Sequence, residues 1–123
     1  MDAVELYIKQ AVDHKNNGRV REAIEAYSEA FDYLLMEARR FAQKTIGYRD
    51  DDEKREIPPE YFDAVRDYLR RDQNAARISN NGGVLFARLG DYETAKKWFE
   101  QAIDLYPDGE YQEARTNIVD DSK

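Results

Sequence analysis

The sequence of 123 residues has no cysteine, no long apolar run and a single histidine. Without cysteine there is no disulfide, no thiolate nucleophile and no cysteine-ligated metal centre, and a reducing compartment is favoured. No apolar run approaches the roughly 20 residues that cross a bilayer. The acidic N-terminus also lacks the basic and apolar regions of a signal peptide. We therefore expect a cytoplasmic protein with no membrane partner.

Groupings of residues typical of catalysis are also missing. His14 has no second histidine beside it for acid–base work, and its position predicts an aromatic that packs between helices. The run Asp50–Glu53 lacks the alternating spacing of a calcium loop, and no glycine-rich phosphate loop is present. We predict a protein that is not an enzyme, with no catalytic residue, no metal and no cofactor. The net charge of −7 argues against nucleic acid as a partner.

The apolar residues recur every three or four positions, as in amphipathic helices, and no useful strand alternation occurs. The predicted class is all-α, with one domain spanning 1–123. Residues 48–57 read as an acidic loop and 120–123 as a frayed tail. Helices are expected over 3–15, over 20–46, from Pro59, from Tyr92 to Leu105, and over 110–119. The helix that begins at Pro59 is able to run unbroken through Asn80–Gly83.

A short pattern occurs twice. Glycine, alanine, an aromatic and a second alanine recur at identical spacing with an offset of 72 residues. Glycine permits a tight turn with positive φ, and small residues allow two helices to cross closely, so each copy predicts a helix pair that stacks on another. The two sets are Gly18, Ala23, Tyr27, Ala30 and Gly90, Ala95, Phe99, Ala102.

These residues resemble the tetratricopeptide repeat family, whose units are helix–turn–helix pairs of 34 residues. Residues 76–109 cover a whole unit, although Ser79 stands where tryptophan is usual and Gly82 where leucine is usual. Residues 4–37 match less well, and 110–119 resemble the cap helix of such arrays. The positions that fall in register in the better unit are Gly83, Phe86, Leu89–Tyr92, Ala95, Phe99, Ala102 and Pro107.

Two architectures fit the segment between the copies. Residues 38–75 form either a degenerate middle repeat or a long helical hairpin. A middle repeat needs a turn near Tyr33–Glu37, and no turn residue occurs there, which favours the hairpin. Gly82 costs about 1 kcal/mol of helix stability relative to alanine. We therefore expect a helix or a large side chain to pack against it.

The resemblance implies a concave groove, lined by the first helix of each pair, that holds a peptide or a partner helix. We expect a non-catalytic scaffold or adaptor for a partner protein. The alternative is self-assembly into a homo-oligomer through the hairpin or a repeat end. The carboxylate clamp of some family members is not carried over, because Ile8 and Val12 occupy its Lys and Asn positions. The expected peptide-binding residues are Lys9, Val12 and Lys15, with Glu5 and Ile8 beside them, and Arg77, Asn80, Asn81, Val84 and Arg88.

A cluster of arginines lies before the second copy. It favours pairing on the surface with nearby carboxylates over contact with an acidic peptide, since exposed arginines commonly find such partners. The arginines are Arg66, Arg70, Arg71 and Arg77, and the expected partners are Glu60, Asp63 and Asp67.

Overall fold

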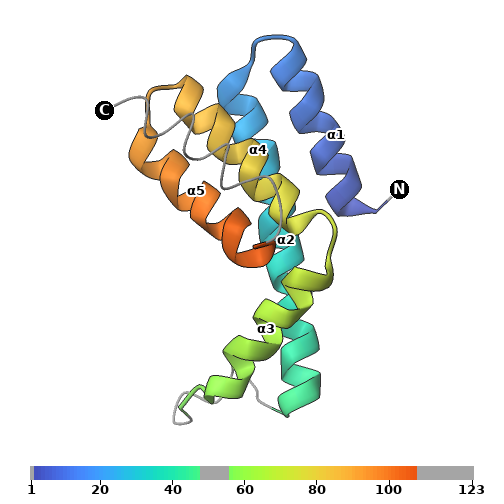
Figure 1. Cartoon of the computed structure of the whole chain (residues 1–123). Coiled ribbons are helices and arrows are strands. Elements are labelled where there is room, and N and C mark those ends of the chain that lie inside the picture. Colours follow the sequence, from blue (N-terminus) through green and yellow to red (C-terminus); the bar gives the residue numbers. More distant parts are fainter. Residues whose placement is uncertain (1, 48–55, 108–123) are drawn as a thin grey trace.

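The computed structural model describes residues 2–47 and 56–107, and within these ranges it contains helices and no strand (Figure 1). The all-α prediction is confirmed. The predicted cap helix over 110–119, the tail 120–123 and most of the acidic loop lie outside the described residues. The helices are α1 (Ala3–Asn16), α2 (Val20–Ile46), α3 (Pro59–Arg71), α4 (Ala75–Arg88) and α5 (Tyr92–Leu105).

Helices α1 and α2 form one antiparallel pair, and α4 and α5 form another, with the same turn in each. Gly18 has φ 75° and Gly90 has φ 82°. In the first turn Arg19 N–H donates to the His14 carbonyl at 2.8 Å, and in the second Asp91 N–H donates to the Phe86 carbonyl at 3.0 Å. This is the glycine-dependent helix ending in which a backbone bond spans five residues. The offset of 72 therefore relates two copies of one structural unit.

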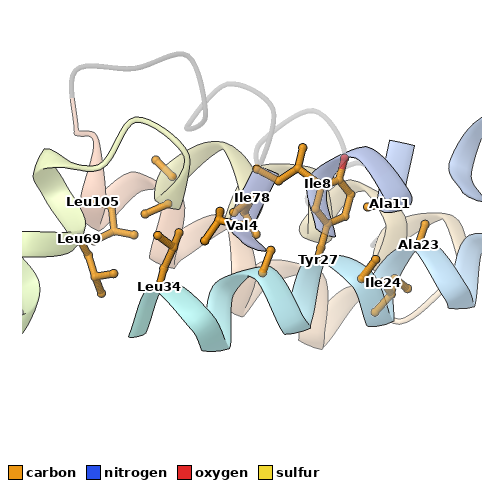
Figure 2. Packing of buried hydrophobic residues seen from close by; sticks show 14 of the residues in the cluster. Val4, Ile8, Ala11, Ala23, Ile24, Tyr27, Leu34, Leu69, Ile78 and Leu105 are labelled. Carbon is orange, nitrogen blue, oxygen red and sulfur yellow. The ribbon is translucent and has the colours of Figure 1, made fainter. Parts of the chain in front are cut away.

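The core forms where the two pairs stack. The alanines and aromatics of the repeated pattern are all buried, including Tyr27 and Phe99 at the equivalent aromatic position. α2 packs against both α1 and α4, so it is the helix through which the first pair contacts the second. Figure 2 shows Tyr27 and Leu34 of α2 close to side chains contributed by the other helices, among them Val4, Ile8, Ile78, Leu69 and Leu105.

α2 runs unbroken for 27 residues through Tyr33–Glu37 and ends at Gly47, which has φ 75°. Its second half leaves the two pairs and packs against α3, so the two form a projecting hairpin (Figure 1). Ala42 of α2 and Tyr61 and Ala64 of α3 form a small separate core there. The structure thus has the long hairpin and not a middle repeat.

The predicted continuous helix from Pro59 through Gly83 is wrong at one place. α3 ends at Arg71, and Asp72 is extended, with φ −86° and ψ 121°. The Asp72 Oδ1 atom accepts a hydrogen bond from the Asn74 N–H at 2.8 Å. Short Asp and Asn side chains bond nearby backbone groups and so compete with a continuing helix. The break lets α4 change direction and return to the core.

The arginines of α3 pair with a different helix from the one predicted. Arg66 Nε lies 3.5 Å from one Asp104 carboxylate oxygen, and Arg70 Nη2 lies 3.4 Å from the other. Arg70 Nε also donates to the Asp104 carbonyl at 3.2 Å. The expected pairing with Glu60, Asp63 and Asp67 is therefore wrong, since α5 comes close enough to supply the carboxylate. These contacts tie the base of the hairpin to α5.

Helix α4 continues through Asn80–Gly83, as predicted, and both glycines are buried against α5. A methyl group added at Gly82 would overlap the Trp98 ring, and one at Gly83 would lie 2.9 Å from the Phe99 ring. The prediction of a large side chain against Gly82 is thus confirmed. None of the described helices is both long and apolar enough to cross a membrane.

Candidate peptide-binding groove

A shallow hollow lies between the first half of α1 and the start of α4, with a volume of about 310 Å³. Ile8 is buried and supplies its apolar part, while the other lining residues are polar. The break at Asp72 brings Gln73 and Asn74 to one rim. The lining residues are Glu5, Ile8, Lys9, Gln73, Asn74 and Arg77.

The two cations of the hollow come from different helices. Lys9 on α1 and Arg77 on α4 are both exposed, and neither forms an ion pair with any residue in the described ranges. Glu5 is the one carboxylate that lines the hollow, and it too has no ion-pair partner there. The hollow therefore presents two cations against one anion, on a chain whose net charge is −7.

Tyr27 of α2 connects the core to this site. The Asn81 amide donates to the Tyr27 hydroxyl at 3.5 Å, which links α4 to α2. Burial raises the pKa of Tyr27, and the hydrogen bond from Asn81 and the positive charge of Arg77 partly oppose that rise. Arg77 is thus near enough to act on the phenol electrostatically. The Asn81 amide nitrogen is engaged within the fold.

Asn80 differs from Asn81. Its side chain is half-buried, and its Oδ1 atom is buried with no hydrogen-bond partner among the described residues. A buried acceptor left without a donor costs about 1–3 kcal/mol. Val84, one helical turn further along α4, is also half-buried. The Asn80 acceptor is therefore closed off from the surface, and Val84 packs against the core between α4 and α5.

The predicted site residues are thus only partly brought together. Lys9 and Arg77 face one hollow, with the expected Glu5 and Ile8 beside them. Asn80, Asn81, Val84, Val12, Lys15 and Arg88 do not line it, and of these Val12, Lys15 and Arg88 are exposed. Sequence reasoning missed Gln73 and Asn74, because it allowed an unbroken helix there. The closely spaced Asp72 and Asn74, both residue types that favour helix starts, were the available signal.

The single histidine has a local role. His14 is half-buried, and its Nδ1 accepts a hydrogen bond from Arg19 Nε at 2.9 Å across the first turn. Its predicted packing between helices stays a prediction, and the contact that the structure shows is this hydrogen bond within the turn. Among the described residues, no group of three or more His, Asp or Glu side chains is arranged to hold a metal ion.

Two stacked helix pairs with the same glycine turn define the class of helical repeat proteins. Residues 76–108, which contain α5 and all of α4 except its first residue, match the family model described as tetratricopeptide repeat. The match supports a relationship between the chain and that family. No curated protein and no solved structure gives a significant match to the chain.

Proposed function

We propose that the protein is a non-catalytic adaptor or scaffold that binds a peptide or helix of a partner protein in the groove between α1 and α4. A tetratricopeptide repeat at 76–108 suggests a protein–protein interaction module. The observation that carries the more specific proposal is the pair Lys9 and Arg77, which face one hollow without an ion-pair partner in the described ranges. We also propose a cytoplasmic location, which fits a chain of 123 residues without cysteine.

The ligand chemistry follows from these groups. Lys9 and Arg77 bind a carboxylate of the partner, and the planar guanidinium of arginine can hold it with two hydrogen bonds. Ile8 contacts an apolar side chain next to it. The partner segment is therefore acidic, with an apolar residue close to its acid.

The remaining predicted residues do not line the hollow, and we propose that they add contacts to a longer segment of the partner. Val12 and Val84 provide apolar contacts, and Asn81 keeps α4 against α2 while presenting its carbonyl side. Lys15 and Arg88 lie at the far ends of α1 and α4 and draw an acidic segment along the groove through longer-range attraction. That attraction weakens with salt, because exposed charges are screened within about 8 Å at physiological ionic strength.

A random peptide library displayed on phage tests the proposal without a known partner. The wild type is expected to enrich acidic peptides, and Lys9→Glu/Arg77→Glu is expected to lose them. Lys96→Glu/Lys97→Glu on α5 makes the same change in net charge on two exposed lysines outside the groove, so it serves as the control. Circular dichroism verifies that all three proteins are folded. Enrichment of the same acidic peptides by the groove variant would rule out this site.

A further inference from the structure

One side of the hairpin carries a stripe of side chains from each helix, and we call it the hairpin face. Residues spaced by three and four share one side of a helix. The two stripes meet where the Phe41 and Tyr68 rings lie 5.4 Å apart and the Tyr68 hydroxyl donates to Glu37 Oε2 at 3.1 Å. The face consists of Glu37, Arg40, Phe41 and Lys44 from α2, and Glu60, Ala64, Asp67, Tyr68 and Arg71 from α3.

Opposite charges occupy the two edges of the hairpin face. Toward the tip, α2 presents Arg40 and Lys44, and α3 presents Glu60 and Asp67. All four are exposed, and none forms an ion pair with another described residue. At the base the signs reverse, with Glu37 on α2 and Arg71 on α3. The face thus has three levels along the hairpin. At each level a charged residue of α2 is matched by a residue of opposite charge on α3.

The centre of the face is apolar. Phe41 remains 38% exposed although its ring touches Tyr68. Ala64 is buried and packs with Ala42 and Tyr61 between the two helices. A shallow hollow of about 330 Å³ lies at the base, lined by Phe41, Tyr68, Arg71 and Asp72. An aromatic centre between charged edges is the composition of a protein interface.

We propose that two copies of this chain pair through the hairpin face, with a two-fold axis parallel to the hairpin. With this axis, α2 of one copy packs against α3 of the other copy. Residues at the same height along the hairpin then face each other. Arg40 then meets Asp67, Lys44 meets Glu60 and Glu37 meets Arg71, and symmetry makes every pair twice. The two hairpins form an antiparallel four-helix bundle around Phe41 and Tyr68.

The charge pattern selects a second copy over an unrelated partner, because the face is complementary to itself. A two-fold axis perpendicular to the hairpin would instead place α2 on α2, with basic residues against basic residues. Like charges facing each other across an interface oppose association. The pairing also leaves the groove between α1 and α4 to the partner peptide, since no residue is shared by the hairpin face and that groove.

Charge exchange tests the arrangement by sedimentation equilibrium over a concentration series. The wild type is expected to dimerise. Arg40→Glu/Lys44→Glu gives two acidic edges, and Glu60→Lys/Asp67→Lys gives two basic edges, so each alone should weaken the dimer at least about a hundredfold. An equal mixture of the two variants should restore a dimer, and so should one chain carrying all four changes. Arg39→Glu, at a position of α2 that is not three or four residues from any member of the hairpin face, should leave the dimer intact.

Three results would overturn the proposal: a wild type that is monomeric at all concentrations, charge variants that still dimerise, or a mixture that stays monomeric. Circular dichroism shows whether the variants fold. If either variant fails to fold, Arg40→Gln/Lys44→Gln and Glu60→Gln/Asp67→Asn replace the two charge reversals. These substitutions remove the charges without reversing them. Each must then weaken the dimer, and an unchanged dissociation constant rejects the face.

Discussion

Trp98 of α5 packs over Gly82 of α4, and its indole fills the space that a side chain at residue 82 would occupy. In the repeats that this segment resembles, tryptophan is usual at the position of Ser79 and leucine at the position of Gly82. Two large side chains are therefore missing from α4. Trp98 supplies the lost volume from the facing helix, and its ring lies 5.5 Å from that of Phe86. The interface between α4 and α5 therefore remains filled, and the large side chain comes from α5 instead of α4.

Gly82→Ala should therefore destabilise the protein. Alanine favours a helix over glycine by about 1 kcal/mol, but crowding a packed interface costs about 1–3 kcal/mol. The overlap with Trp98 involves a ring held between α4 and α5, so we expect the crowding to win and the free energy of unfolding to fall. Urea denaturation measures it, and Gly82→Leu should lose more.

The background Trp98→Ala provides the control for this prediction. Without the indole, Gly82→Ala meets open space and should raise the free energy of unfolding by up to about 1 kcal/mol. The sign of the effect thus depends on residue 98. A stabilising Gly82→Ala in the wild type would show that Trp98 does not hold its place against α4.

Ser79 joins α4 to α5 through a partly buried hydrogen bond. It is fully buried, donates to the Ala75 carbonyl at 2.9 Å and accepts from Gln101 Nε2 at 2.9 Å. Ser79→Ala should lower the free energy of unfolding by about 1–2 kcal/mol, because the Gln101 amide loses its partner. In a Gln101→Ala background the same change should cost less. Equal costs in the two backgrounds would show that the two residues are not coupled.

Asp104 should contribute modestly and in a salt-dependent way. Its partners Arg66 and Arg70 have side chains 55% and 41% exposed, and ion pairs at such exposure contribute below about 1 kcal/mol. Asp104→Asn should lower the free energy of unfolding in dilute buffer and have little effect near 1 M NaCl, where screening acts within about 3 Å. Asp63→Asn, which breaks no ion pair of the described structure, is the control. A loss independent of salt would contradict the electrostatic account.

Alkaline pH should destabilise the fold through two tyrosines. Burial raises the pKa of Tyr27, and burial together with the Glu37 carboxylate raises the pKa of Tyr68. Above the usual tyrosine pKa of about 10, the unfolded chain releases protons that the folded chain retains, so stability falls as pH rises through that range. Thermal unfolding between pH 8 and about 11 measures the effect. Tyr27→Phe and Tyr68→Phe should flatten the profile, and Tyr92→Phe, on an exposed ring, controls for loss of a hydroxyl.

The repeat was predictable because its determinants are local. Glycine at the turn, alanines at the crossing and an aromatic one turn later specify a helix pair from residues close in sequence, and the bounds of α2 followed from an uninterrupted apolar pattern. Gly82 was also informative, because a helical glycine in place of leucine required a neighbour. The sequence alone could not say that the neighbour was Trp98, which lies 16 residues away on the facing helix.

The parts that failed depend on tertiary placement. The break at Asp72 redirects α4 toward the core, and only that redirection brings Gln73, Asn74 and Arg77 beside α1. In the same way, Arg66 and Arg70 pair with Asp104 because α5 contacts α3 in the folded chain. These residues are more than 30 positions apart in the sequence. Helical spacing orders side chains on one element. It does not show which elements will be neighbours.

The most direct test of the account is the affinity of an acidic peptide selected by the wild type, measured by fluorescence anisotropy. Lys9→Glu/Arg77→Glu should weaken binding at least about tenfold, a change of about 1.4 kcal/mol. Lys96→Glu/Lys97→Glu should bind like the wild type. Equal affinity for the groove variant and the wild type would contradict the central claim that α1 and α4 together form the binding site.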